Sequence, residues 1–185
     1  MGSLAGKKIA IIIERDFQDL EAWFPYLRLQ EEGAVVEFVA PEKKEYAGKF
    51  GYPAMAERAL RQVKPDDYDC LVIPGGFAPD FLRRYPPCIE FVRDAYAKGK
   101  LIASICHGPW ILVSAGILKG KRATCFAAIA VDIQNAGAHY EDSEVVTDGR
   151  IITSRKPEDL PAFCRAIIKA LGVRGQGSGV SKRKA

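Results

Sequence analysis

The chain has 185 residues, of which 48% are hydrophobic and 27% charged, a composition typical of one globular domain that buries its own core. No apolar stretch reaches the roughly 20 residues of a membrane-spanning helix, and no signal-peptide pattern opens the chain, so the sequence predicts no membrane association and a cytoplasmic location. Four of the 27 basic residues and none of the 23 acidic residues lie in 172–185; the rest of the chain is therefore neutral, which argues against specific nucleic-acid binding.

Short apolar runs alternate with amphipathic segments along the chain. Runs rich in β-branched residues predict buried strands, and apolar residues at helical spacing predict helices. In chain order the predicted elements are a strand at 8–13, a helix at 18–32, a strand at 35–40, a turn or small hairpin at 48–53, a strand at 69–74, short helices at 79–84 and 87–98, a strand at 100–105, a helix at 108–115, a strand at 121–125, a helix at 128–135, a strand pair at 144–147 and 151–153, and a closing helix at 157–171.

This alternation predicts an α/β fold with a mostly parallel sheet covered by helices on both faces. Because no linker or internal repeat interrupts it, we expect residues 1–171 to form a single domain. Residues 172–185 combine glycine with basic residues and are predicted to form a flexible basic tail.

Ligands of such folds bind beyond the carboxyl ends of the strands. Three segments are expected to meet there: the acidic loop after the first strand, Pro74-Gly75-Gly76, and Cys106-His107-Gly108. Their convergence is the main functional signal in the sequence.

Cys106 lies between a predicted strand and a predicted helix. Backbone N–H groups and the positive helix end are expected to face its sulfur, which predicts a nucleophilic thiolate with a pKa below 7. The other cysteines show no C-x-x-C or zinc-ligand spacing and are expected to be reduced and structural; they are Cys70, Cys88, Cys125 and Cys164. With two histidines and no glycine-rich nucleotide motif, the sequence predicts neither a metal site nor a cofactor.

The remaining candidates each have a functional and a structural interpretation. His107 is either a general base or a residue that only lines the turn. The N–H groups of Gly75 and Gly76 either form an oxyanion hole or belong to a plain turn. An acid that reached Cys106 would stay protonated and donate to the sulfur; the candidates are Glu14, Asp16, Asp19 and Glu21.

Several blocks of the sequence resemble the PfpI family, within the superfamily of the parkinsonism-associated protein deglycase. The resemblance covers roughly residues 8–171, with the blocks in order and at family-like spacing, and it is most specific at Ile-Cys-His-Gly-Pro with the upstream Pro-Gly-Gly. The blocks are residues 17–21, 31–33, 73–80, 104–109, 135–138, 142–149 and 153–160.

The resemblance implies a flavodoxin-like three-layer α/β/α sandwich of the class I glutamine-amidotransferase-like type, assembled as a homodimer or a trimer of dimers. It implies that Cys106 is the nucleophile, His107 its partner and Glu21 the protonated acid near the sulfur. Asp80 occupies the position of the acid that, in the protease-like members, orients the histidine from a neighbouring subunit. The N–H of Gly76, with one at the cysteine turn, resembles the oxyanion hole.

Two positions depart from the protease-type pattern: Asp80 stands where those members usually carry glutamate, and Gln18 replaces a glutamate of the usual Phe-Glu-Asp. An aspartate resembles the bacterial stress-protein branch, to which deglycase and glyoxalase-like activities are attributed. We therefore expect a cysteine hydrolase that acts on methylglyoxal or glyoxal adducts. The alternatives are a cysteine protease or amidase acting on peptides, and a redox-sensing stress chaperone in which Cys106 oxidises reversibly.

Overall fold

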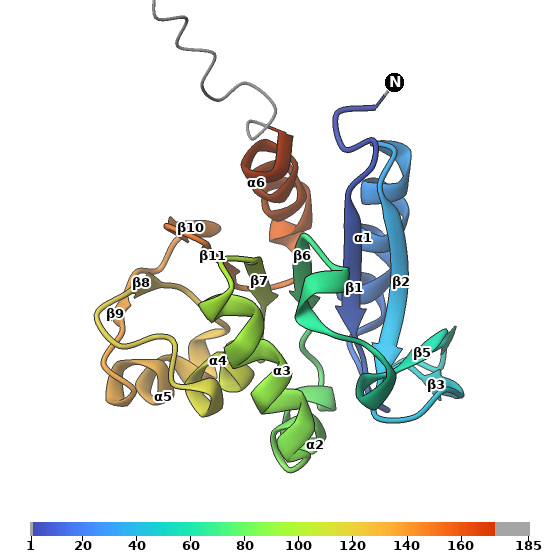
Figure 1. Ribbon diagram of the computed structural model, residues 1–185. Coiled ribbons are helices and arrows are strands. Elements are labelled where there is room, and N and C mark those ends of the chain that lie inside the picture. Colours follow the sequence, from blue (N-terminus) through green and yellow to red (C-terminus); the bar gives the residue numbers. More distant parts are fainter. Residues whose placement is uncertain (1, 173–185) are drawn as a thin grey trace, which may run out of the picture.

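A computed structural model describes residues 2–172 as three layers, with a central sheet between helices (Figure 1). The sheet has seven strands in the order β10-β11-β7-β6-β1-β2-β5. All neighbouring strands are parallel except β10, which pairs with β11 in the antiparallel sense. The strands are β1 (Lys8–Ile12), β2 (Val35–Ala40), β5 (Arg58–Ala59), β6 (Cys70–Ile73), β7 (Leu101–Ile105), β10 (Val145–Asp148) and β11 (Ile151–Ser154).

Each face of the sheet packs against its own set of helices. One face carries α1 (Asp19–Glu31) and α6 (Leu160–Gly172). The other face carries α2 (Ala78–Arg83), α3 (Pro86–Ala97), α4 (Pro109–Ala115) and α5 (Ala130–Asn135). Short 3-10 turns lie at Leu60–Gln62, Pro65–Asp67, Ala127–Ile129 and Pro157–Asp159. The predicted flavodoxin-like α/β/α sandwich is confirmed.

Burial on both faces explains the continuous apolar runs of the central strands. Every residue of β6 and β7 is buried, as parallel strands covered by helices require. On α6 the buried Phe163, Ile167 and Leu171 follow one another at four-residue intervals, so a single helix face packs on the sheet.

The segment predicted as a strand at 121–125 differs from the expectation. Only β8 (Arg122–Ala123) is extended, and it pairs with β9 (His139–Tyr140) in a separate two-stranded sheet. After Ala123 the chain leaves the ladder because the N–H of Thr124 donates to Oγ1 of Thr153 at 2.9 Å. The N–H of Phe126 then donates to the carbonyl of Cys106 at 3.0 Å, which brings an aromatic ring over the end of β7.

The predicted turn at 48–53 joins β3 (Glu45–Ala47) to β4 (Pro53–Met55) in an antiparallel hairpin. Phe17, in the loop after β1, forms isolated bridges to Gly48 of this hairpin loop and to Gly76 after β6. Three segments far apart in the sequence are thereby tied together at the carboxyl edge of the sheet, where β7 delivers Cys106.

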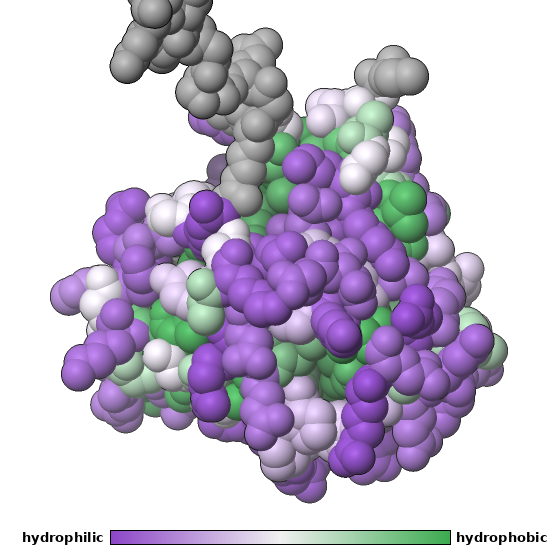
Figure 2. Space-filling model, viewed as in Figure 1, coloured by the Kyte–Doolittle hydropathy of each residue, from purple (hydrophilic) through white to green (hydrophobic). Residues whose placement is uncertain are grey.

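The face of the molecule shown in Figure 2 is mostly hydrophilic, with hydrophobic residues in scattered groups. Within residues 2–172, no helix combines the length and apolar character that a bilayer crossing demands. Gly172 closes α6, one residue beyond the predicted helix, and residues 173–185 of the predicted tail lie outside the described part of the chain.

Candidate active site

Cys106 begins a sharp turn directly after β7. Its φ is +62°, a left-handed conformation that is strained for a residue with a side chain. Gly108 makes the turn possible, because a Cβ there would lie 2.4 Å from the carbonyl oxygen of Ile73 and 2.5 Å from Oγ of Ser104. The strained backbone directs the sulfur away from the sheet and toward the loops at its carboxyl edge.

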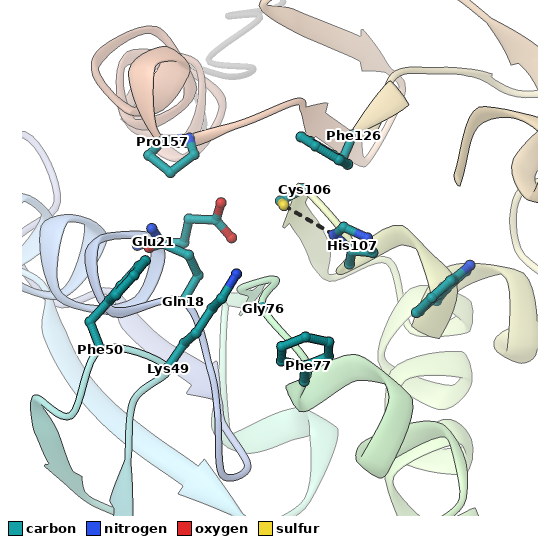
Figure 3. A pocket seen from close by; sticks show the side chains of 11 residues that line it. Gln18, Glu21, Lys49, Phe50, Gly76, Phe77, Cys106, His107, Phe126 and Pro157 are labelled. Atoms are coloured by element: carbon teal, nitrogen blue, oxygen red, sulfur yellow. Dashed lines mark hydrogen bonds between the residues drawn. The ribbon is translucent and has the colours of Figure 1, made fainter. Parts of the chain in front are cut away.

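A pocket of about 350 Å³ opens in front of Cys106 (Figure 3). In the close-up, the side chains of Glu21, His107 and Lys49 reach from three sides toward one space beside the sulfur. The lining residues are mostly aromatic or polar: Gln18, Glu21, Lys49, Phe50, Gly76, Phe77, Cys106, His107, Trp110, Phe126 and Pro157.

His107 is within reach of the cysteine proton, since its Nδ1 lies 3.3 Å from Sγ of Cys106. The ring stacks on Phe126 at 5.1 Å and meets Trp110 edge-on at 5.2 Å. Burial and the charge of Lys49 lower the pKa of His107, so the imidazole is neutral at pH 7 and able to accept a proton. Aromatic rings therefore orient this histidine within the described chain.

Glu21 faces the sulfur from the first turn of α1. Gln18 caps that helix, its Oε1 accepting the N–H of Glu21 at 2.9 Å. The Glu21 side chain is fully buried; its Oε2 accepts the N–H of Gly75 at 2.7 Å, and its Oε1 has no partner within residues 2–172. Burial raises the pKa of Glu21 to about 7, although the hydrogen bond from Gly75, the nearby Cys106 thiol and the charge of Lys49 lower it.

The pKa of Cys106 does not follow the expectation from the sequence. Burial raises the pKa of this thiol, and the charge of Glu21, when ionised, raises it further. The N–H groups of Gly76 and His107, which hydrogen-bond the sulfur, lower it but do not compensate. The prediction of a pKa below 7 is therefore wrong, because the argument from the helix end left out the loss of solvent around the sulfur.

The two glycines after β6 allow the backbone to approach the sulfur. A Cβ on Gly75 would lie 2.7 Å from Cβ of Cys106 and 2.7 Å from Oε2 of Glu21. Gly76 has φ +76°, and a Cβ there would lie 2.4 Å from the carbonyl oxygen of Asp16. The site thus excludes a larger residue at both positions; the N–H of Gly75 is used by Glu21, whereas that of Gly76 faces the sulfur.

Asp80 does not join this group within the described chain. It lies on α2, where its carboxylate forms an ion pair with Arg84 at 2.7 Å and is 51% exposed. Of the other acids near α1, Asp19 accepts the N–H groups of Phe50 and Tyr52 at 2.9 and 3.0 Å, which holds the hairpin loop. No three metal-ligating side chains gather anywhere in residues 2–172.

Sequence reasoning missed Lys49 and the aromatic wall of the pocket. The side chain of Lys49 comes from the β3–β4 loop, far from Cys106 in the sequence, and Phe126 arrives through the change of direction after β8. The bridge between Phe17 and Gly48 places the neighbouring Lys49 at the pocket. No local pattern in the sequence indicates this bridge.

The chain is similar to proteins of one family over nearly all its length. The model of the DJ-1/PfpI family matches residues 7–170. Deglycase PfpI of Pyrococcus furiosus is 43% identical over 89% of this chain and 99% of that protein. Putative cysteine protease YraA of Bacillus subtilis is 40% identical over 89% of this chain and 98% of its own.

A solved structure from Anabaena variabilis, a two-domain protein containing DJ-1/ThiJ/PfpI-like and ferritin-like domains, superposes with a TM-score of 0.88 at 41% identity. The match covers 97% of this chain and 52% of that protein. This chain therefore spans about half the length of the two-domain protein.

Proposed function

The chain belongs to the DJ-1/PfpI family and is an enzyme of the hydrolase type, and we propose that it is a cysteine-dependent deglycase acting on methylglyoxal or glyoxal adducts. The observation that carries the proposal is the geometry at Cys106: a strained turn at φ +62° places the sulfur 3.3 Å from a neutral histidine and beside a buried acid. The deglycase name of the Pyrococcus relative supports the same reaction.

In the proposed reaction a proton first shifts from C1 to C2 of the methylglyoxal hemiaminal, which oxidises C1, reduces C2 and gives a lactoyl amide. Sγ of Cys106 then adds to the amide carbonyl carbon as its proton passes to Nδ1 of His107. The carbonyl electron pair moves to oxygen, and the N–H groups of Gly76 and His107 stabilise the resulting oxyanion. We assign the oxyanion hole to this pair, because the N–H of Gly75 donates to Glu21. The tetrahedral intermediate collapses as His107 returns its proton to the leaving amine, and water then hydrolyses the lactoyl thioester to lactate and free Cys106. The sum is adduct plus water to free amine plus lactate.

Glu21 supplies a proton donor where the reaction needs one. With a pKa near 7 it is protonated in a large share of molecules at neutral pH, and its unpartnered Oε1 is then able to donate to sulfur or substrate oxygen. A protonated Glu21 also removes the negative charge that opposes thiolate formation at Cys106.

The test is turnover of a methylglyoxal-modified lysine peptide, followed by recovery of free amine and lactate. We expect amine recovery faster than spontaneous adduct dissociation, and loss of that excess in Cys106→Ser. A rate capped by spontaneous dissociation would show that the enzyme consumes only free aldehyde, which is the glyoxalase-like activity.

Peptidase activity is the second candidate, because the Bacillus relative carries the name of a putative cysteine protease. Casein serves as its substrate in the same assay. Cleavage of casein without turnover of the adduct would replace the deglycase proposal. Protection of a client protein that persists in Cys106→Ala would favour a chaperone.

A further inference from the structure

Among residues 2–172, Lys49 is the only lysine or arginine that lines the active-site pocket. Its backbone is held firmly, since its N–H donates to the carbonyl of Phe17 at 2.8 Å. The flanking Gly48 lies against Asp19, where an added Cβ would come within 2.5 Å of Oδ1. The loop therefore presents this cation at a defined place.

The Lys49 side chain points into the pocket from the wall opposite His107 (Figure 3). Its Nζ lies 5.6 Å from the ring centre of Phe50 and 5.3 Å from that of Phe77. Within residues 2–172 it forms no ion pair, whereas Lys44 on the same hairpin is paired with Glu42 at 2.7 Å. Aromatic faces support the cation and leave its charge uncompensated.

The charge of Lys49 acts on the reacting groups across the pocket. It lowers the pKa of Glu21 and the pKa of His107. Within the described residues the only acid lining the pocket is Glu21, whose pKa of about 7 leaves it partly neutral at pH 7. Lys49 is exposed at the mouth of the pocket, and the neighbouring rings of Phe50 and Phe77 are 74% and 58% exposed. Its attraction for an anion is therefore that of a partly solvated charge, and it weakens as salt is added.

We propose that Lys49 binds a carboxylate carried by the substrate and thereby favours adducts formed on amino acids or peptides with a free carboxylate near the reacting carbon. This rests on the proposed deglycase function and names the substrate class of that site. A singly charged carboxylate matches one ammonium group. A phosphate, with nearly twice the charge, is commonly bound by several donors, and the part of the chain that the structure describes places no second lysine or arginine in this pocket.

The first experiment compares two substrates that differ only in this charge: the methylglyoxal adducts of N-acetylcysteine and of N-acetylcysteine amide. We expect wild type to favour the carboxylate by about fivefold to tenfold in kcat/KM. Lys49→Gln should bring the ratio to about one, and Lys49→Arg should retain it. The ratio cancels any change in Cys106 reactivity, because both substrates meet the same nucleophile.

The second experiment needs no turnover. Alkylation of Cys106 by iodoacetate and by iodoacetamide is followed by peptide mapping, and the ratio of the two rates is measured at low and high salt. We expect Lys49→Gln to lower the iodoacetate-to-iodoacetamide ratio about fivefold at low salt. Lys43→Gln is the matched control, because it removes the same charge from an exposed position at the start of the same hairpin.

The outcomes separate the two proposals. If wild type turns over neither adduct, the deglycase function fails and the alkylation ratio alone decides the role of Lys49. Turnover no faster than spontaneous dissociation of either adduct would likewise reject the deglycase function. A wild-type substrate ratio near one with turnover faster than that dissociation, or an alkylation ratio that Lys49→Gln leaves unchanged, would overturn the carboxylate site. A phosphorylated adduct that outcompetes the carboxylate would assign the cation to phosphate instead.

Discussion

At the scale of single residues, the strain at Cys106 is held by its own backbone hydrogen bonds. The N–H of Cys106 donates to the carbonyl of Ser154 at 3.1 Å, and its carbonyl accepts the N–H of Phe126 at 3.0 Å. A left-handed residue with a side chain costs about 1–3 kcal/mol, and such conformations persist where the surrounding structure over-determines them. Here β11 and the segment after β8 provide that restraint.

Glu21 is a buried acid whose ionisation works against folding. Its pKa is raised from 4.5 to about 7 by burial, so the folded state binds its proton more tightly than the unfolded state does. The stabilisation is complete below pH 4.5 and is lost as the pH rises through about 7, a change of up to about 3 kcal/mol.

We therefore expect Glu21→Gln to flatten this part of the stability profile. Glutamine keeps an acceptor for the N–H of Gly75 but cannot ionise. The measurement is urea unfolding between pH 4.5 and 8, with both proteins in a Cys106→Ser background so that the cysteine does not titrate. Parallel profiles for the two proteins would contradict the raised pKa.

At the scale of elements, the β3–β4 hairpin contributes to the site through Asp19. Its carboxylate accepts the N–H groups of both Phe50 and Tyr52, so one side chain of α1 ties down the loop that carries Lys49. Both oxygens are used, and an amide of the same shape has only one acceptor.

Asp19→Asn should free this loop, because its amide N–H₂ would face a backbone N–H. We expect a cost of about 1–3 kcal/mol and faster hydrogen exchange at the amides of Phe50 and Tyr52, with KM raised more than kcat is lowered. Glu45→Gln, on the exposed part of the same hairpin, is the control. Unchanged exchange at both amides would show that Asp19 does not hold the loop.

At the scale of the whole molecule, His107 has no carboxylate partner within residues 2–172, and Asp80 points to solvent beside Arg84. We propose that the protein assembles as a homodimer or a trimer of dimers in which Asp80 of one subunit orients His107 of the next. A neutral histidine that contacts only aromatic rings and the cysteine sulfur would gain a fixed tautomer from such a carboxylate.

Asp80→Asn should then lower kcat on the order of 10²-fold or more without changing the assembly, as measured by sedimentation. Mixed oligomers provide the sharper test. Subunits with Cys106→Ser keep Asp80, and subunits with Asp80→Asn keep Cys106, so co-assembly should restore part of the activity. No recovery in proven mixed oligomers, or full activity in a dissociated monomer, would rule out the shared site. Arg84→Gln controls for the local ion pair.

The amino-acid pattern alone predicts the fold class and indicates Cys106 as the candidate nucleophile. Strands such as β6 and β7 can be recognised in the sequence as continuous apolar runs, because both of their faces are buried and neither needs polar residues. Local sequence also singles out Cys106, Gly75 and Gly76. A cysteine directly after a predicted strand suggests a nucleophile, and paired glycines after a strand suggest a close approach of the backbone.

Tertiary contacts set the direction in which the pKa values of Cys106, Glu21 and His107 shift, and they bring in the far wall of the pocket. The direction of a pKa shift depends on how much solvent folding removes from the thiol or acid. A predicted helix end in the sequence gives no measure of that loss, and at Cys106 burial outweighs the backbone N–H groups and raises the pKa. Lys49 and Phe126 reach the site through the bridge at Phe17 and the hydrogen bond to Cys106. Contacts between segments distant in the chain leave no local pattern in the sequence. The places of Lys49 and Phe126 in the pocket are therefore known only from the three-dimensional structure.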